Sequence, residues 1–508
     1  MTLRRLLDAP LLARLRERLR AALPDGGDAA GVAESSDNGL LSITLPLDAD
    51  LDACWQAADF TRSHVVGWAQ PANGETRLAL GYAMIFGTAG PARFAALQAA
   101  FAGIAPYWRH DDSARTGHAP AAHLGFAFDE EAHDCNAEGL CELPNARLVV
   151  PAILLQARDG QCSATFSCAV RDADTAIERW QAELAAASRS RPRALPASLP
   201  RLARRRATPL AERAFLARVR AALADIAGGR LAKVVLTRST RIDAGRNIVP
   251  AQLLAALAAR HPECTIYGVG QHGRCFVGAT PERLVALDAG IVRADALAGT
   301  AWRGDDHART EPSELSPQAR QPALQDDKNG REQQLVVDAV RAALAPLCAS
   351  LDAPQPPEVL QVRELQHLRT GIVGRVRAGV GLFDLIARLH PTPAVGGTPG
   401  ADARRWLRAH RERRAAWYTG GIGWIDRAGD GEIAVALRCA CIDGAQAELF
   451  AGAGIVAGSD PQQELAETEA KFGPLLAALD TLDAAGSPGI AAGLPSRSSS
   501  PQRRTGTP

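Results

Sequence analysis

The stretch TGGIGWIDRAGDGEIAVALRCACIDGAQAELFAGAGIVAG, residues 419–458, decides the fold class. It contains three apolar runs separated by the short polar turns RAGDGE and GAQ. Apolar runs bounded by glycine and aspartate predict adjacent strands joined as hairpins. Helical spacing occurs in separate segments, such as residues 329–347 and 461–482. Hairpin strands beside separate helices predict an α+β fold rather than a doubly wound parallel sheet.

The composition is that of an ordinary globular protein. The chain has 508 residues, of which 47% are hydrophobic and 22% charged, and its formal net charge is +1. This charge predicts no general attraction to nucleic acid or to anionic membranes. Because no apolar run approaches about eighteen residues, we expect no transmembrane helix. Ten cysteines without a disulfide-scaffold pattern favour reduced thiols, so we expect a cytoplasmic protein.

The chain divides into four parts by composition. Residues 1–187 form an N-terminal part, which opens with an arginine-rich amphipathic helix that ends near Pro24 and does not resemble a secretory signal. Residues 188–209 form a connection rich in proline and arginine, and residues 210–484 hold most of the candidate functional residues. Residues 485–508 have almost nothing to bury, so we predict a disordered tail. No internal repeat with a period of 20–50 residues is visible.

Carboxylates on two helices are candidate ligands for a divalent cation. Glu464, Glu467 and Lys471 share one face of the last helix, since they are spaced i, i+3 and i+7. That face is either solvated or directed at a hard cation such as Mg²⁺, which prefers carboxylate oxygens. Glu332, at the start of another helix, could supply a further carboxylate, or it could simply complement the helix dipole.

Two further ionisable residues border apolar strands. Lys233 begins a strand run and is either an edge lysine or, in a dry pocket, a base with a lowered pKa. Glu282 follows the turn at Thr280-Pro281 and is either an exposed turn residue or a buried acid able to donate a proton. Arg438 lies within an apolar run, so it must pair either with an internal carboxylate or with a ligand carboxylate.

Two other patterns are weaker. The segment GAGIVA, residues 452–457, matches a dinucleotide fingerprint, but no helix opens inside it, so we predict no nucleotide site. A group of histidines and cysteines lacks the tight spacing of zinc sites, and we interpret its members as loop residues. They are His110, His118, His123, His133, Cys135 and Cys141.

Together these segments resemble the chorismate-utilising enzyme family, of which anthranilate synthase component I is a member. The similarity is carried in order by KVVLTR, FVGATPERLV, ALAGTAWRG, REQQLVVDAV, LQHL, LHPTPAVGG, YTGGIGW, VALRCA, LFAGAGIV and SDPQQELAETEAK, within residues 231–475. A weaker likeness, in VVGWAQPANGETRLALGYA and GFAFDE, extends it toward the N-terminus. The resemblance implies antiparallel β-sheets packed face to face, with helices outside and a deep central cleft. Residues 188–209 would then join two halves of one fold.

The resemblance also implies roles for individual residues. Lys233 matches the lysine that activates water for attack at C2 of chorismate, and Glu282 matches the acid that protonates the departing C4 hydroxyl. Glu332 and Glu467 match Mg²⁺ ligands, with Glu464 as a supporting acid. The substrate-binding positions implied are Thr300, His367, Ala394, Arg438, Gly452 and Lys471. REQQ departs from the family's usual histidine-bearing pattern beside Glu332, without removing a proposed catalytic group.

Two alanines favour water over ammonia as the nucleophile. Ala394, in LHPTPAVGG, and Ala298, in LAGT, stand where ammonia-using relatives carry threonine and lysine. The resemblance therefore implies an Mg²⁺-dependent isochorismate synthase that acts on chorismate as a monomer, without a glutaminase subunit. The alternatives are a salicylate synthase, which would also eliminate pyruvate, an ammonia-using relative, and a non-catalytic chorismate-binding protein. The product could feed menaquinone, siderophore or salicylate synthesis.

Overall fold

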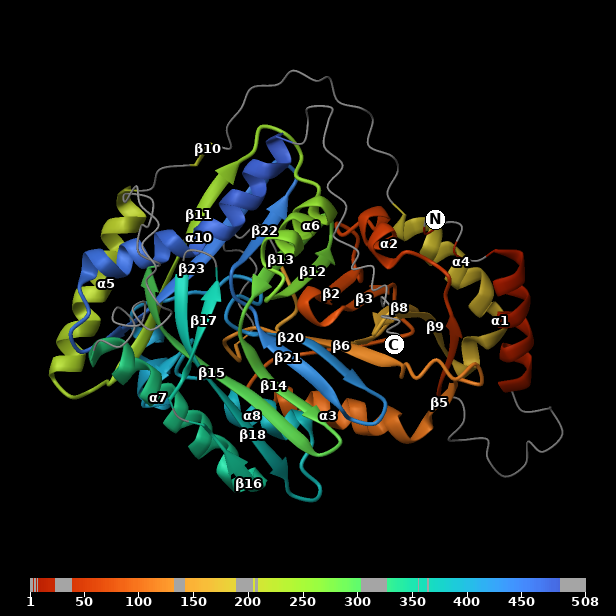
Figure 1. Ribbon diagram of the computed structural model, residues 1–508, viewed down its shortest axis with the longest axis horizontal. Helices are drawn as coiled ribbons and strands as arrows, with labels where there is room; N and C mark the ends of the chain where they lie inside the picture. The colour runs from red at the N-terminus through yellow and green to blue at the C-terminus, as the bar shows by residue number, and fades with distance from the viewer. Residues whose placement is uncertain are drawn as a thin grey trace, which may run out of the picture.

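The computed structural model describes residues 8–22, 39–131, 142–188, 209–302, 327–354, 356–362 and 365–484, with Leu3, Leu6 and the pair 204–205. The strands of these segments form two large sheets (Figure 1). The described strands pair antiparallel, apart from one parallel pair at the edge of the larger sheet. The predicted α+β class is confirmed.

The larger sheet has 13 strands. In spatial order they are β10 (Arg204–Arg205), β11 (Lys233–Asp243), β23 (Gln446–Val456), β22 (Cys439–Asp443), β13 (Arg274–Thr280), β12 (Thr265–Gln271), β2 (Val66–Gln70), β3 (Glu75–Leu80), β8 (Ile153–Arg158), β9 (Gln161–Ala169), β1 (Leu40–Pro46) and β5 (Trp108–Asp111), with β19 (Gly397–Thr398) paired to β11.

The smaller sheet has 10 strands. In spatial order they are β16 (Cys348–Asp352), β18 (Leu365–Val376), β15 (Ile291–Trp302), β14 (Arg283–Asp288), β21 (Gly431–Val435), β20 (Gly421–Asp426), β6 (Ala121–Phe126), β7 (Ala146–Val150) and β4 (Met84–Thr88), with β17 (Glu358–Val362) paired to β18. The helices are α1 (Ala9–Ala22), α2 (Leu51–Ala57), α3 (Arg93–Ile104), α4 (Ala176–Ala187), α5 (Pro209–Ala227), α6 (Pro250–Arg260), α7 (Asp327–Leu344), α8 (Leu382–Leu389), α9 (Gly400–Ala409) and α10 (Pro461–Ala484).

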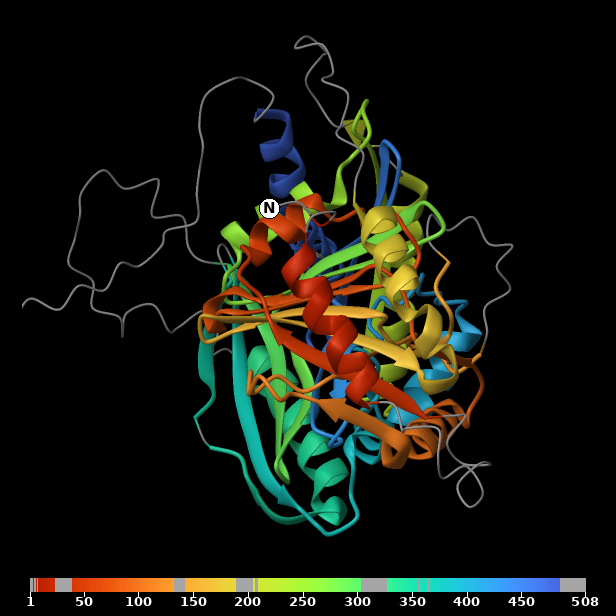
Figure 2. The same cartoon turned by 90° about the vertical axis from the view of Figure 1, so that its right-hand side faces the viewer.

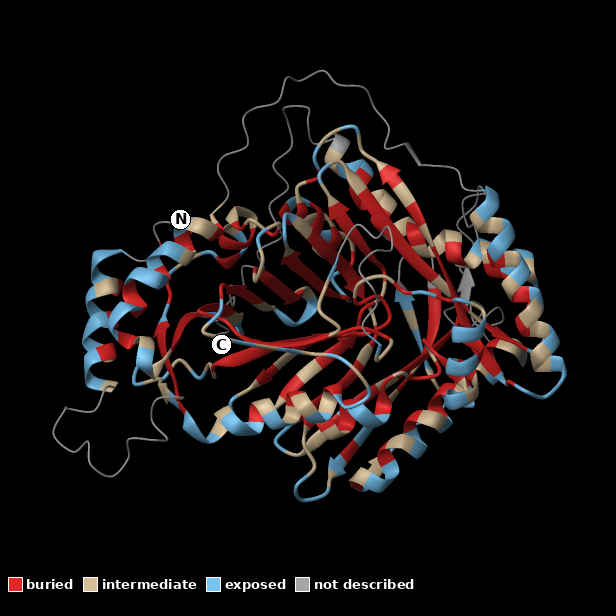
Figure 3. Ribbon diagram, turned by 180° about the vertical axis from the view of Figure 1, so that it is seen from behind, coloured by how far each residue is buried: buried red, intermediate tan, exposed pale blue. Residues whose placement is uncertain are grey.

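Three apolar layers hold the sheets and helices together. The layer between the two sheets includes Trp68, Tyr267, Phe276, Trp417 and Ile422. A second layer packs α1, α2, α4, α6 and α10 against the larger sheet, and a third packs α3, α7 and α8 against the smaller one. Figure 2 shows α1 lying across the outside of one end of the molecule. In Figure 3 the strands are mostly buried, while the helices expose their outward faces. The predicted face-to-face sheets with helices outside are confirmed.

Segments on both sides of the predicted connection build both sheets. β2 pairs with β12 in the larger sheet, and β6 pairs with β20 in the smaller one. The predicted N-terminal part and the region 210–484 therefore share one core. Most of the connection 188–209 and all of the tail 485–508 lie outside the described residues.

Four connections of two or three residues carry the chain from one sheet to the other. Residues 281–282 and 436–438 lie side by side, since they join paired strands in both sheets; we call them the C-terminal crossover. Residues 81–83 and 151–152 have the same arrangement in the first half of the chain; we call them the N-terminal crossover. In the larger sheet the order β1-β9-β8-β3-β2 is repeated by β11-β23-β22-β13-β12, and in the smaller sheet β4-β7-β6 is repeated by β14-β21-β20. The strands β15 to β18 have no counterpart among the described strands of the first half. This partial repetition of topology is not revealed by a short sequence period.

One strand prediction was wrong. The sequence predicted a single strand over residues 431–443, but the structure has two strands, β21 and β22, in different sheets. The break falls at Arg438, whose φ of 47° is in the left-handed region and cannot continue a strand. Arg438 is therefore not in the middle of a strand but at the sheet-to-sheet junction.

Two other patterns behave as predicted. GAGIVA continues β23 antiparallel to β11 and opens no helix. The helix α10 begins at Pro461, where the Asp460 side chain accepts hydrogen bonds from the backbone N–H groups of Gln462 and Gln463.

The prediction that the histidine and cysteine group lies in loops was wrong for two members, because His110 lies on β5 and His123 lies on β6. The Nε2 atom of His123 is buried and has no hydrogen-bond partner among the described residues. His110 Nε2 lies 2.8 Å from Thr44 Oγ1, and His118 Nδ1 lies 2.6 Å from Ser163 Oγ. The remaining members His133, Cys135 and Cys141 lie outside the described residues. None of the described helices combines the length and apolar character needed to cross a bilayer.

Candidate active site

A cavity of about 80 Å³ lies against the C-terminal crossover. Its wall includes the predicted site residues Glu282, Glu332, His367, Ala394, Arg438, Gly452, Glu467 and Lys471. Residues from both sheets, from α7 and α10, and from the loop 389–400 therefore meet at one place. Thr300 lies opposite His367 in the register of β15 and β18, and its side chain lies outside the described residues.

Glu282 is a buried carboxyl group with a raised pKa. It is 3% exposed and lies between β13 and β14, where its backbone carbonyl accepts a hydrogen bond from the N–H of Val435. Burial, reinforced by the charge of Asp295 and opposed by Lys233 and Lys471, raises the pKa of Glu282 to about 8. At neutral pH this group therefore keeps its proton, which a general acid requires.

Arg438, at the junction between β21 and β22, and His367, on β18, form a buried pair. Arg438 Nη2 lies 2.9 Å from His367 Nε2, and His367 Nδ1 lies 3.1 Å from the carbonyl oxygen of Gly299. Burial, together with the charges of Arg438 and Lys471, lowers the pKa of His367 well below its ordinary value. The neutral ring therefore donates from Nδ1 to Gly299 and accepts at Nε2. Arg438 Nη1 is buried and has no hydrogen-bond partner among the described residues, so it can bind a ligand oxygen.

Lys233 borders the cavity through an ion pair. It begins β11, is fully buried, and its Nζ lies 2.8 Å from Oε1 of Glu332, on α7. Gly454 makes room for this pair, because a Cβ there would lie 2.3 Å from Glu332 Oε1 and 2.9 Å from Lys233 Cε. The glycine of GAGIVA thus serves close approach of side chains.

The two acids on α10 are paired in the same way. Lys471 Nζ donates to Glu467 and to the carbonyl oxygen of Gly452, the latter at 2.9 Å. Lys328 Nζ lies 2.7 Å from Oε1 of Glu464, which is 1% exposed. Burial and the neighbouring Glu467 raise the pKa of Glu464. Three lysines therefore each neutralise one of the three predicted metal ligands.

The chemistry of this donor set fits a hard cation. Glu332, Glu464 and Glu467 all act on the charge of Lys328, so they face a common region. Their oxygens do not converge to within 4.8 Å of one another, because each is directed at its own lysine. A divalent cation would take over the charge that the lysines now balance. The assignment of these residues as metal ligands stays a prediction.

The loop 389–400 forms one wall of the cavity. Ala394 and Val395 line the cavity, and the carbonyl oxygen of Gly396 accepts a hydrogen bond from the N–H of Val235 at 3.0 Å. Thr398 pairs with Lys233 in the sheet, so the loop is bonded to the strand that carries the lysine.

Arg414, whose hydrogen bonds hold this loop in place, was not predicted from the sequence. Arg414 is 3% exposed and donates to the carbonyl oxygens of Val395 and Val235, at 2.6 and 3.0 Å, and to Thr419 Oγ1. It lies in the run RERR, which has the appearance of a solvated charged segment. The apolar AAW that follows was the available signal that this arginine turns inward.

A larger cavity, of about 570 Å³, lies on the other side of the same loop. We place the active site in the smaller one for two reasons. The buried acid Glu282 and the unpaired nitrogen of Arg438 both lie there. Perturbed ionisable groups that converge on one cavity are typical of catalytic sites.

Comparison with known proteins agrees with this geometry. The model of a protein family described as "Chorismate binding enzyme" matches residues 27–480 of this chain. The chain belongs to this family of chorismate-binding enzymes. The predicted resemblance is confirmed.

Curated relatives and solved structures carry more particular names. The salicylate biosynthesis isochorismate synthase of Pseudomonas aeruginosa is 37% identical over 270 residues, which is 53% of this chain and 55% of that protein. The isochorismate synthase MenF of Bacillus subtilis is 37% identical over 267 residues, 52% of this chain and 55% of its own length. This chain thus matches little more than half the length of these two relatives. The structure of MenF, the menaquinone-specific isochorismate synthase of Escherichia coli, matches with a TM-score of 0.70 at 25% identity, over 92% of this chain and 98% of that one.

Proposed function

We propose that this protein is an isochorismate synthase, which converts chorismate to isochorismate. The observation that carries the proposal is the buried carboxyl group of Glu282 at the C-terminal crossover, whose pKa is raised by burial. It lines the same cavity as Glu332, which is the ion-pair partner of Lys233. An acid that keeps its proton at neutral pH, near a lysine able to act as a base, suits the exchange of one hydroxyl group for another on a ring. The names of the relatives point to the same reaction.

The proposed reaction moves one proton at each of these residues. Lys233 takes a proton from water as its oxygen bonds to C2 of chorismate, and Glu282 gives its proton to the C4 hydroxyl as that C–O bond breaks. Both ring double bonds shift by one position, the C4 hydroxyl leaves as water, and the net change is an isomerisation. Lys233 must be neutral to act as a base, and in this structure its Nζ is engaged in the ion pair with Glu332. Lys233 therefore becomes competent when Glu332 turns to another partner.

Mg²⁺ is the partner that we propose for Glu332. Glu332 and Glu467 would hold the ion, with Glu464 as a supporting acid, and the ion would neutralise and orient the ring carboxylate of the substrate. Arg438 would bind a substrate carboxylate through its unpaired Nη1, held in place by His367. Lys471 and the backbone of Gly452 would complete the anion-binding wall.

The pocket wall also supports water as the nucleophile. Ala298 and Ala394 both line it, so no threonine or lysine side chain stands at these positions to bind ammonia or to attack the ring. We therefore propose a synthase that works without a glutaminase subunit. A cytoplasmic monomer remains our expectation.

The experiment is to incubate the purified protein with chorismate and Mg²⁺ and to resolve the products by chromatography. We expect isochorismate alone, abolished by EDTA and by Lys233→Ala. Salicylate with pyruvate would replace the proposal with a salicylate synthase. Chorismate binding without turnover would leave a binding protein.

A further inference from the structure

The larger cavity is separated from the active site by one stretch of chain. Leu389, Pro391, Thr392, Gly397 and Thr398 line it from one side of the loop, while Ala394 and Val395 of the same loop line the active site. Its volume of about 570 Å³ is in the range of small-molecule sites. The proposed reaction makes no use of this cavity.

The cavity carries an excess of positive charge. Four arginines and two acids line it, and His390 is neutral, because burial, reinforced by the charge of Arg93, lowers its pKa to about 3. Arg93 donates to the carbonyl oxygen of Phe128 and to Asn145, and Arg408 pairs with Glu130 at 3.2 Å.

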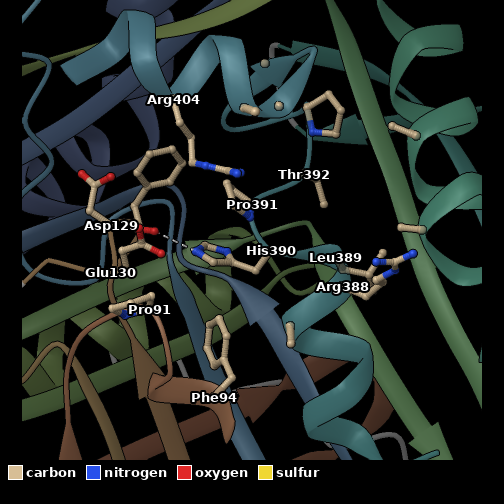
Figure 4. Close-up of a pocket in the computed structure, with 18 of the residues that line it drawn as sticks. Pro91, Phe94, Asp129, Glu130, Arg388, Leu389, His390, Pro391, Thr392 and Arg404 are labelled. Carbon is tan, nitrogen blue, oxygen red and sulfur yellow. Dashed lines mark hydrogen bonds between the residues drawn. The ribbon is translucent and has the colours of Figure 1, made fainter. Parts of the chain in front are cut away.

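The other two arginines of the lining are Arg388 on α8 and Arg404 on α9. Neither makes a hydrogen bond or ion pair with any residue in the described part of the chain. Figure 4 shows them on different sides of the cavity, with His390, Pro391 and Thr392 between them.

The rest of the lining is apolar or aromatic. Phe94, Phe128, Pro391 and Pro393 add flat hydrophobic surfaces to the lining of the same cavity. In Figure 4 the ring of Phe94 lies below His390, whose Nε2 is hydrogen-bonded to the carbonyl oxygen of Phe128. Flat apolar walls suit a ring, and two separated guanidinium groups suit one anionic group at each end.

We propose that this cavity is a second binding site, which takes a cyclic or aromatic dicarboxylate. Arg404 and Arg388 each bind one carboxylate, and the ring packs against the proline-rich loop. The site communicates with the active site through the loop itself. Thr398 and Gly397 line the cavity and pair with Lys233 and Val234 of β11, so a ligand that shifts this wall also shifts the catalytic lysine.

The test is calorimetric titration of the full chain with benzene-1,3-dicarboxylate. We expect binding to the wild type, and a loss of about tenfold in affinity in each of Arg388→Gln and Arg404→Gln. Arg405→Gln is the matched control, because it is the neighbour of Arg404 on the same helix, pairs with Asp402 and does not line the cavity. Benzoate, with one carboxylate, is expected to bind about tenfold more weakly than the dicarboxylate.

Two results would overturn the proposal. One is the absence of binding to the wild type, or binding that all three arginine variants retain. The other is binding that is lost in Arg438→Gly, which would place the dicarboxylate in the active site. A change in chorismate turnover on occupancy, without competition, is expected as well, and only this part rests on the proposed function. If that function fails, turnover is absent while the titration still reports the second site.

Discussion

The two crossovers use one backbone design for different ends. In each, two short connections pass between the sheets side by side, and backbone groups close the gap: Ala83 N–H bonds to Val150 at the first, and Val435 N–H bonds to Glu282 at the second. The side chains differ. Residues 81–83 and 151–152 read GYA and PA, whereas residues 281–282 and 436–438 read PE and ALR.

This difference teaches where the chemistry of the molecule comes from. A sheet-to-sheet junction gives a side chain a buried position at strand ends, and the repeated topology supplies that position twice. Only the C-terminal crossover fills it with a carboxyl group and a guanidinium group, Glu282 and Arg438. The fold provides the place, and the residues provide the function.

The largest expected effect follows from removing the acid of the C-terminal crossover. Glu282→Gln keeps the shape of the side chain but cannot donate the proton, so we expect turnover of chorismate to fall by about 10²–10⁴-fold. Tyr82→Phe, in the N-terminal crossover, is the matched control and should leave turnover unchanged. Equal losses in both variants would break the comparison, because they would indicate a structural effect.

A smaller effect is expected from the arginine of the same crossover. Arg438→Gly removes the guanidinium while glycine accepts the φ of 47° without strain. We expect KM for chorismate to rise by about 10–100-fold, because a charge-assisted contact to the substrate is lost. Steady-state kinetics measures this, with Ala152→Gly at the N-terminal crossover as the control. An unchanged KM would show that Arg438 serves the fold alone.

The pH dependence of turnover tests whether Glu282 acts as the acid. Because the pKa of Glu282 is raised to about 8, the acid is protonated below that pH and ionised above it. We expect kcat to fall about tenfold per pH unit above pH ~8, since only the protonated form acts. The residual activity of Glu282→Gln should not fall in this way above pH ~8. If the fall persists in the variant, it is caused by the titration of another group.

The last effect concerns stability and not turnover. Between the ordinary pKa of 4.5 and the raised value of about 8, the unfolded chain is ionised at Glu282 while the folded chain holds a proton. The group therefore destabilises the fold increasingly as pH rises through this window, and the cost levels off above it. We expect Glu282→Gln to exceed the wild type in free energy of unfolding by about 4 kcal/mol at pH ~8, and by about 1 kcal/mol at pH ~5. Denaturant melts at both pH values check this, and a gain that is independent of pH would contradict it.

Much of the site could be predicted because its residues have short sequence signals. Lys233, Glu282 and the acids of α10 each lie in a segment that resembles the family, and the structure brings them to one cavity or its border. The strand content of residues 419–458 was likewise legible from its turns.

The rest depended on long-range geometry. The apolar run continues on both sides of Arg438, so the switch between sheets leaves no local mark. The repeated topology is a property of strand pairing and not of sequence similarity. The pairing of three glutamates with Lys233, Lys328 and Lys471, and the inward turn of Arg414, depend on contacts between elements far apart in the chain.

The most direct test of the account is the proton on Glu282. Infrared difference spectra of wild type against Glu282→Gln isolate the C=O stretch of this one carboxylic acid. We predict a protonated band at pH ~7 that disappears with a midpoint near pH 8, as burial of the group requires. A carboxylate band at pH ~7 and below would contradict the account, because the crossover would then hold no acid for the reaction.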